Sequence, residues 1–427
     1  KSAAVSEELS YYLEPGDESD NSTYQTVNIH SDITHIQWGE LNPQVIGDVQ
    51  WSIKESNSVY TSLLAKYQVE CEDDEGETQD YNVKEFYRVR LSGDTIYLLD
   101  YNRDMQQVFN GNRNVLDENG IRFGIASDNI QYVANDDDTI VAFVRERDLW
   151  LYNKKTDELS QVFSFANREG RDERSRNDQH AVRIISMENS GSLAFAVYGY
   201  MSRGNHEGTT GIALYRYESA GNALTERLYL PASTDYGNLR QDINQLCYLS
   251  GGHTLYVLMN HAVYSVDLTG KEYMVVADGL TEENFAVSTD ASRIAWQDGA
   301  DIYRSTKLHV MNLETGKKDE ISFPDQTVIR LIGFVGTDLV YGLAHPNEQL
   351  TMDGRVTGLP LYAVEIVGSN MEMETRYEKP GVSLVDVRIQ DSRVHLSRMR
   401  QIGSGYQPMD EDTLVCNEEV SKDPLDG

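Results

Sequence analysis

The stretch Ser288-Thr-Asp-Ala-Ser-Arg-Ile-Ala-Trp296 decides the fold. It begins with the turn pattern Ser-x-Asp-x-Ser, directly after an apolar strand at 285–287, and ends in the strand Ile-Ala-Trp. A third strand is expected at 308–312, and the turn Thr315-Gly316 leads to a fourth. Four short antiparallel strands joined by such turns, about 40 residues in all, form one blade of a β-propeller.

The same pattern, a turn followed by an apolar or aromatic strand, recurs along the chain. Its copies lie roughly 40 to 60 residues apart, as expected for blades with loop insertions. They are found at 95–99, 140–143, 193–195, 255–257, 294–296, 339–341 and 394–396. No long helical pattern alternates with these strands, which argues against a Rossmann-type fold. The sequence therefore predicts an all-β propeller of seven four-stranded antiparallel blades, or of eight if the N-terminal strands form their own blade.

A second stretch carries the pattern, Asp136-Asp-Asp-Thr-Ile-Val-Ala-Phe-Val-Arg-Glu-Arg-Asp-Leu-Trp-Leu-Tyr152, and 188–195 is a looser copy. These stretches resemble the repeat of TolB-like propellers and of prolyl oligopeptidase-type propeller domains, Ser-Pro-Asp-Gly-x-x-(Ile/Leu)-Ala-(Phe/Trp). Thr289 stands for its Pro and Ala291 for its Gly. The resemblance covers 85–400 and implies a fold rather than a function, because such repeats serve scaffolds, binding proteins and enzyme gates.

No Gly-x-Ser-x-Gly motif occurs in the chain, and no α/β region follows the repeats, so the peptidase activity of that family is not implied. The stretch 288–296 is also close to the sialidase-type box Ser-x-Asp-x-Gly-x-x-Trp, with Ser292 in the place of Gly. Because it matches the other blade turns, we interpret it as structural. No catalytic residue is predicted.

The ends of the chain are expected to differ from its repeats. We predict an acidic, flexible arm or tether at 1–23, the propeller at 24–420 and a C-terminal tail at 421–427. Strand-like runs occur at 24–30, 33–38 and 49–53, while 58–70 fits a short helix or a strand equally well. The irregular part, 24–84, is expected to complete the closing blade, which would join the two ends of the chain and remove open strand edges.

The charge of the chain limits its partners. It has 37 Lys and Arg against 69 Asp and Glu, a net charge of −32, which repels nucleic acids and anionic membranes. No apolar run reaches the 18 residues of a membrane-spanning helix. The chain opens on Lys1-Ser-Ala-Ala without a signal peptide. We expect an extracytoplasmic monomer, anchored at the cell surface through an N-terminal signal or a lipid or membrane anchor that has been removed.

The three cysteines do not have metal-site spacing. Cys247 alternates with Ile243 and Leu249 along a predicted strand, which indicates a buried free thiol. Cys71 and Cys416 lie near the two ends of the chain and either pair in a disulfide or stay free. No cofactor or metal is expected. Calcium is a weak alternative at 72–75 and 135–138, which lack the spacing of an EF-hand loop and otherwise fit solvated turns.

Long loops identify the predicted binding face. In a blade, the loop between the second and third strands and the connection to the next blade emerge at the same end of the sheet. The long segments 198–211 and 166–180 are of these two kinds, and 297–307 and 344–358 extend the same rim. The candidate binding residues combine aromatic and polar groups: Tyr198, Tyr200, Arg203, His206 and Glu207 from one loop, with Arg171 and Arg174 from the other.

These features predict a non-catalytic protein that binds a protein, a peptide or a glycan through its loop-rich face. A blander interpretation is that the two loops only pack on each other through Arg–Glu pairs. The alternative function is a carbohydrate-active enzyme, a glycosidase or lyase, with two carboxylates about 5–10 Å apart in a central channel.

Overall fold

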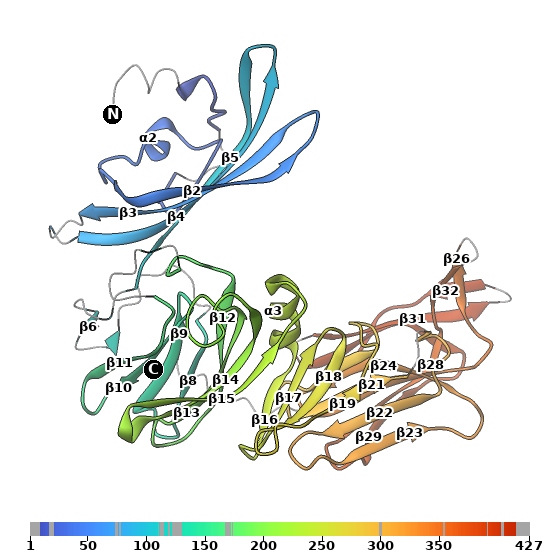
Figure 1. Ribbon diagram of the computed structural model, residues 1–427. Helices are drawn as coiled ribbons and strands as arrows, with labels where there is room; N and C mark the ends of the chain where they lie inside the picture. Colours follow the sequence, from blue (N-terminus) through green and yellow to red (C-terminus); the bar gives the residue numbers. More distant parts are fainter. Residues whose placement is uncertain are drawn as a thin grey trace. The chain divides into compact units, whose positions relative to one another are not determined.

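The computed structural model (Figure 1) describes residues 9–16, 21–72, 76, 78–109, 111, 115–117, 120–121, 130–166, 172, 174–298, 301–352, 355–390, 392–402 and 405–415. Nearly all regular structure in them is antiparallel strand, so the predicted all-β class is confirmed. The chain divides into two compact units, 1–178 (unit 1) and 179–427 (unit 2). The two units are described separately.

Unit 1 contains a five-stranded antiparallel sheet with the strand order β1-β5-β4-β3-β2. Its strands are β1 (Thr26–Asn28), β2 (Gln44–Ser56), β3 (Thr61–Glu72), β4 (Thr78–Ser92) and β5 (Thr95–Gln107). The segment that fitted a helix or a strand is therefore a strand, β3. All described pairs of this sheet lie within residues 26–107, and none joins the C-terminal strands that the closing-blade prediction invoked.

One predicted strand in this region is wrong, because residues of the run 33–38 form the helix α2 (Ile33–Ile36). The carboxylate of Asp32 accepts a hydrogen bond from the His35 backbone N–H at 2.8 Å, which caps the helix start. Arg103 of β5 donates to the carbonyls of His35 and Ile36, each at 2.8 Å. Capping and this buried guanidinium together hold α2 against the sheet.

The second sheet of unit 1 is the first four-stranded meander, in which strands adjacent in sequence pair in order. It consists of β8 (Tyr132–Ala134), β9 (Ile140–Arg145), β10 (Asp148–Asn153) and β11 (Glu158–Phe163). Its core contains Phe143, Trp150 and Tyr152. A separate hairpin is formed by β6 (Leu116–Asp117) and β7 (Gly120–Ile121).

Unit 2 continues with further meanders. The first three are β12 (His180–Met187), β13 (Leu193–Tyr200), β14 (Thr210–Glu218) and β15 (Ala223–Pro231); β16 (Cys247–Ser250), β17 (Thr254–Met259), β18 (Ala262–Asp267) and β19 (Tyr273–Ala277); and β20 (Phe285–Val287), β21 (Arg293–Gln297), β22 (Lys307–Asn312) and β23 (Lys318–Ser322). A short 3-10 helix, η1 (Ser219–Gly221), joins β14 to β15. The helix α3 (Tyr236–Gln245) lies between β15 and β16.

The last strands of unit 2 form two groups that share one sheet. The first is β24 (Val328–Val335), β25 (Asp338–Ala344), β28 (Leu361–Val367) and β29 (Met373–Glu378), and the second is β30 (Val382–Gln390), β31 (Arg393–Ile402), β32 (Gly405–Pro408) and β33 (Asp412–Val415). A single pair, Leu361 with Leu384, connects them. The predicted loop 344–358 contains a hairpin of its own, β26 (Leu350–Met352) and β27 (Arg355–Gly358).

The sheets of unit 2 pack face to face in chain order, which is how propeller blades stack. Consecutive residues of β17 enter different cores: Leu255 and Val257 face β12–β15, whereas Tyr256 and Leu258 face β20–β23. Burial on both faces explains why such strands read as continuous apolar runs. The number of blades and the closure of a ring stay predictions.

The stretch 288–296 forms the turn between β20 and β21 and strand β21. The Ser288 hydroxyl donates to Asp290 at 2.7 Å and accepts from the Arg293 backbone N–H at 2.9 Å. Ala291 has a φ of 56°, a left-handed conformation that suits the glycine of the family repeat. Asp138 and Gly191 have positive φ at the same place in the related turns. The interpretation of this stretch as a scaffold corner is therefore consistent with its geometry.

The recurring strand occupies the second position of its meander in β9, β13, β17, β21, β25 and β31. The copy at 95–99 is the exception, because it lies in β5 of the five-stranded sheet. Cys247 is a buried free thiol, as predicted, and burial raises its pKa to about 11. Cys71 is also buried and free, while Cys416 lies outside the described residues.

Candidate functional site

One end of the unit 2 sheets carries a helix and a pocket. Connections between meanders and turns between second and third strands emerge at this end, as the sequence analysis expected. The helix α3 lies in the connection from β15 to β16, next to the β17–β18 turn and to the segment that joins β19 to β20. We refer to this end of unit 2 as the α3 face.

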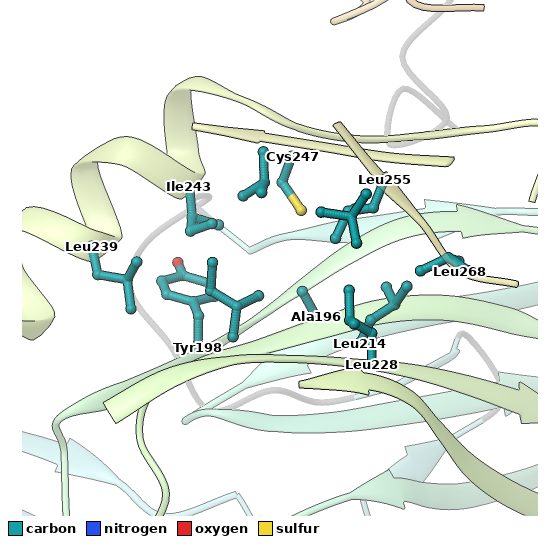
Figure 2. Close-up of a cluster of buried hydrophobic side chains, with 12 residues drawn as sticks. Ala196, Tyr198, Leu214, Leu228, Leu239, Ile243, Cys247, Leu255 and Leu268 are labelled. Carbon is teal, nitrogen blue, oxygen red and sulfur yellow. The ribbon is translucent and has the colours of Figure 1, made fainter. Parts of the chain in front are cut away.

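The sequence makes α3 amphipathic. The side chain of Asp235 caps the helix by accepting a hydrogen bond from the Asn238 backbone N–H at 3.0 Å. Leu239 and Ile243 are fully buried one turn apart and point toward the ring of Tyr198 (Figure 2). The other side of the helix carries a polar stripe at helical spacing, Asn238, Gln241, Asp242 and Gln245.

This polar stripe forms one wall of a pocket of about 340 Å³. The turn Asn260-His261 and the segment 280–282 form the opposite wall, and the floor is apolar. The lining residues are Thr234, Asn238, Gln241, Asp242, Gln245, Leu258, Asn260, His261, Leu280, Thr281, Glu282 and Phe285. A volume in this range suits a small ligand or one side chain of a larger partner.

Three hydrogen-bond contacts hold the walls together. Asp242 Oδ2 accepts from the Asn260 backbone N–H at 2.9 Å, and Gln241 Nε2 donates to Glu282 Oε1 at 2.8 Å. The His261 ring donates through Nδ1 to the carbonyl of Leu280 at 3.0 Å, since a carbonyl can only accept. The pocket is thus built from elements that are tied to each other before any ligand binds.

The turn at the pocket's edge has a left-handed backbone, as does the turn Glu146-Arg147 between β9 and β10. Asn260 has a φ of 53° and His261 a φ of 62°. Two successive left-handed residues are what a two-residue β-hairpin requires, and glycine is the usual second residue. A histidine there carries a strain of about 1 kcal/mol. Strained backbone of this kind is often found at functional sites.

The pocket is acidic. Asp242 and Glu282 contribute carboxylates, and among the residues of its described lining there is no Lys or Arg. Burial raises the pKa of Asp242 above its ordinary value, although the Asn260 N–H and the nearby His261 act in the opposite direction. The site therefore has a partly desolvated carboxylate with one neighbouring donor.

None of the predicted binding residues is among the described residues that line this pocket. Strand β13 extends to Tyr200 and β14 begins at Thr210, so the predicted loop 198–211 is shorter, 201–209. Tyr198 is only 3% exposed and belongs to the core under α3, so its ring is not offered at the surface. Tyr200 is 36% exposed. A Cβ at the intervening Gly199 would meet Tyr236 of α3 at 2.7 Å, which shows how closely the end of β13 packs against the helix.

The loop 201–209 folds back on its own sheet through His206. The ring of His206 stacks on Tyr229 with a centroid distance of 3.7 Å, and its Nε2 lies 2.8 Å from Glu226 Oε1. The hydroxyl of Tyr229 also contacts Thr209 Oγ1 at 2.6 Å. His206 therefore holds the loop in place. Arg203 is partly exposed and Glu207 is exposed in the same loop.

The second predicted segment belongs to the other unit. Arg174 is exposed, and Arg171 lies outside the described residues. The nearby Arg176 donates to the carbonyl of Asp48 at 2.9 Å, and Asp178 forms an ion pair with Lys66, both within unit 1. The predicted packing of the segments 166–180 and 198–211 on each other stays a prediction.

The pocket residues themselves were missed by the sequence analysis. The signal was present: Asp235 is a helix cap, and Leu239, Ile243 and Leu246 follow at spacings of four and three. The predicted strand around Cys247 is wrong in its first part, because Ile243 belongs to α3. Ile243, Cys247 and Leu249 lie at even spacings, as residues on one face of a strand do. In addition, no Gly or Pro marks the boundary between the helix and the strand.

The described residues contain neither a candidate metal cluster nor a helix that could cross a membrane. Among the described residues, no group of three or more His, Cys, Asp or Glu could hold a metal ion. In the turn 135–138, Asp137 contacts Thr139 at 2.5 Å and Lys155 at 2.9 Å, and these contacts lower its pKa to about 2. Of the helices in the described ranges, none has the length and apolar character that spanning a membrane requires.

No family model and no curated protein matches the chain. Among solved structures, a eukaryotic initiation factor aligns with a TM-score of 0.34 and 11% identity over 86% of this chain and 90% of that one. The β-propeller domain of the trilobed protease from Pyrococcus furiosus aligns at 0.29 and 9%, over 87% and 95%. A prolyl endopeptidase aligns at 0.31 and 10%, over 83% and 46%. All three TM-scores are below 0.5, so these alignments carry no argument, and the blade-like architecture is argued from strand order and stacking alone.

Proposed function

We propose that the protein is a non-catalytic binding module, which captures a protein, peptide or glycan partner on the α3 face of unit 2. The observation that carries the proposal is the pocket, a preformed hollow with an apolar floor and convergent polar side chains. Such sites on a rigid scaffold are typical of ligand recognition. The loop 201–209 follows β13, which packs against α3, and its exposed part would extend the surface that a large partner contacts.

Two matched variants test this proposal. Gln241→Trp places an indole over the pocket from an exposed helix position, whereas Glu272→Trp places one in the β18–β19 turn, at the other end of the same sheet. Binding of the labelled protein to peptide and glycan arrays is the measurement. We expect the first variant to lose the binding that the wild type and the second variant retain. Equal binding by both variants would place recognition elsewhere.

The carbohydrate-active enzyme stays the alternative, and the pocket gives it specific residues. Asp242 and Glu282 both line the hollow, and paired carboxylates are the catalytic groups of glycosidases. Release of reducing sugar from the glycans that bind, lost in Asp242→Asn and in Glu282→Gln, would favour the enzyme over the binding module.

The cellular setting is proposed on sequence grounds alone. The net charge of −32 supports a soluble, monomeric module that avoids nucleic acids and anionic lipid surfaces. The acidic stretch at 14–22 suits a tether to an extracytoplasmic anchor. Fractionation of cells that express the natural precursor, followed by detection of the protein, tests this location.

A further inference from the structure

The acidic groups of the α3 pocket, Asp242 and Glu282, face no Lys or Arg in its described lining, and internal hydrogen bonds orient the amide side chains around them. Asn238 donates its side-chain amide to Asp235 Oδ2 at 2.7 Å, and Gln241 donates its amide to Glu282. These bonds use amide nitrogens and fix the orientation of both side chains. Among the described residues, neither amide oxygen, Asn238 Oδ1 or Gln241 Oε1, accepts a hydrogen bond from a protein donor.

The carboxylates add further acceptors. Asp242 accepts one backbone N–H through Oδ2, and Glu282 accepts from Gln241 through Oε1, so each retains an oxygen that faces no protein donor among the described residues. His261 uses Nδ1 toward Leu280, which makes Nε2 of the neutral ring an acceptor as well. The pocket therefore offers two carboxylates that each keep an acceptor oxygen, and no Lys or Arg of its described lining competes with a ligand for them.

The floor of the pocket has a different character. Leu258, Leu280 and Phe285 are buried in the core between the second and third meanders of unit 2 and form an apolar base. An apolar base under a ring of acceptors matches a ligand with an aliphatic stem and a donor-rich, positively charged end. Lysine and arginine side chains have this form, and so do small polyamines.

We propose that the α3 pocket binds an aliphatic cation, an ammonium or guanidinium group on an alkyl stem, with Asp242 and Glu282 as its counter-charges. This inference rests on the proposed function and names the chemistry of its ligand. The cation donates hydrogen bonds to the carboxylate oxygens of Asp242 and Glu282 that accept none from the protein, and its alkyl stem lies over Leu258 and Leu280. Neutral sugars fit the same pocket less well, because they leave the charges of Asp242 and Glu282 without a counter-charge.

Ligand-observed NMR with defined probes tests the proposal. The probes are N-acetyl-L-argininamide, N-acetyl-L-lysinamide and spermidine, with N-acetyl-L-norleucinamide as the neutral probe of similar stem. We expect dissociation constants on the order of 1 mM for the cations and at least about tenfold weaker binding of norleucinamide. Affinity should fall as salt rises, because exposed charges are screened. Equal binding of cationic and neutral probes would overturn the inference.

Variants assign the effect to the two carboxylates. Glu282→Gln keeps Oε1 as an acceptor for Gln241 and removes only the charge, so it should fold normally and weaken cation binding about threefold to tenfold. Asp242→Asn should act in the same direction, and the double variant should abolish the preference for cations. Urea unfolding of each variant identifies any loss that comes from misfolding. A folded double variant that binds cations as the wild type does would contradict the inference.

The outcomes separate this inference from the proposed function. Array binding that Gln241→Trp abolishes, without any preference for cations, would refute the cationic ligand and leave the binding module intact. Array binding that is unchanged in Gln241→Trp would refute both proposals. The source of the cation is decided by affinity: spermidine bound more tightly than an arginine-containing hexapeptide indicates a free polyamine, and the reverse order indicates a peptide partner.

Discussion

Asp290 and Asp242 occupy opposite ends of neighbouring sheets in unit 2, and their surroundings differ in an instructive way. Both carboxylate oxygens of Asp290 accept hydrogen bonds from within its own turn, from the Ser288 hydroxyl and from the Ser292 backbone and hydroxyl groups. Asp242 accepts from one backbone N–H of the Asn260 turn. The oxygens of Asp290 are thus used by its own turn, whereas Asp242 keeps an oxygen that the proposed ligand would contact.

The same contrast holds for the two ends of the unit 2 sheets. One is the α3 face, and the other is the corner end, where the turns between first and second strands lie. At the corner end, turns repeat a common backbone conformation and satisfy their own polar groups, so they resemble one another in sequence. At the α3 face the connection carries an inserted helix, and the pocket polar groups exceed their internal partners. Recognition is expected where a repeat departs from its own pattern.

The largest expected effect comes from detaching α3. Leu239→Ala removes a fully buried side chain from the core under the helix and should destabilise unit 2 by about 3 kcal/mol. Arg240→Ala, on the exposed side of the same helix, is the matched control and should change stability by less than about 0.5 kcal/mol. Urea unfolding measures both. Similar values for the two variants would mean that α3 does not pack as described.

Removal of the Asp290 carboxylate should mainly reduce stability, whereas removal of the Asp242 carboxylate should mainly reduce cation binding. Asp290→Ala leaves the Ser288 and Ser292 groups of the corner without their acceptor and should cost about 1–2 kcal/mol, with no effect on cation binding. Asp242→Ala should cost less than about 1 kcal/mol and weaken cation binding. Unfolding and binding measurements on both variants check the contrast, which fails if the larger stability loss accompanies Asp242.

The two carboxylates should also differ in their dependence on pH. Burial by itself raises the pKa of Asp290, but hydrogen bonds from Ser288 and Ser292 outweigh it and hold the pKa below the ordinary value of 3.8. Its stabilisation is present above pH 3.8 and is lost as the pH falls through the lower folded pKa. The advantage of the wild type over Asp290→Asn should therefore shrink on acidification.

The contribution of Asp242 to stability should change with pH in the opposite direction, because burial raises its pKa above 3.8 in the folded state. The folded protein then holds this proton more tightly than the unfolded chain, so stability decreases as the pH rises from 3.8 through the folded pKa. Asp242→Asn should gain on the wild type over that range. Unfolding curves collected from pH 3 to 7 measure both differences, and slopes of equal sign would contradict the contrast.

The smallest effects concern backbone strain. Ala291→Gly relieves a positive φ at the corner and should stabilise the protein by about 0.5–1 kcal/mol. His261→Gly relieves a similar strain at the pocket but removes the bond to the Leu280 carbonyl, so the net gain should be close to zero. Thermal unfolding compares the two, and a larger gain at 261 than at 291 would show that the histidine bond is weak.

Most of the meanders could be predicted from the sequence, and the reason is burial on both faces. Tyr256 and Val257 enter different cores, so the strand reads as a continuous apolar run between turns. The N-terminal sheet follows another rule. Its residue Trp51 is 59% exposed, and a buried Arg103 holds a short helix, so neither the repeat nor simple alternation is visible there.

The candidate pocket lies at the end of the sheets where the sequence analysis expected long connections, but the sequence analysis named none of its lining residues. Tyr198 was placed in a loop, but β13 continues through Gly199, whose lack of a side chain makes room for Tyr236. The helix was missed because its last turn passes directly into β16 at Cys247. Which polar atoms remain available in a pocket depends on tertiary hydrogen bonds, which sequence patterns do not contain.

Methyl NMR during addition of N-acetyl-L-argininamide tests the central claim most directly, that the α3 face binds and the corner end supports. The reporters are Leu258 and Leu280 at the pocket, and Ile294 and Leu313 beside the corner turns. Our account predicts saturable shifts at Leu258 and Leu280 and unchanged signals at Ile294 and Leu313. Saturable shifts at Ile294 or Leu313, with none at the pocket methyls, would contradict it.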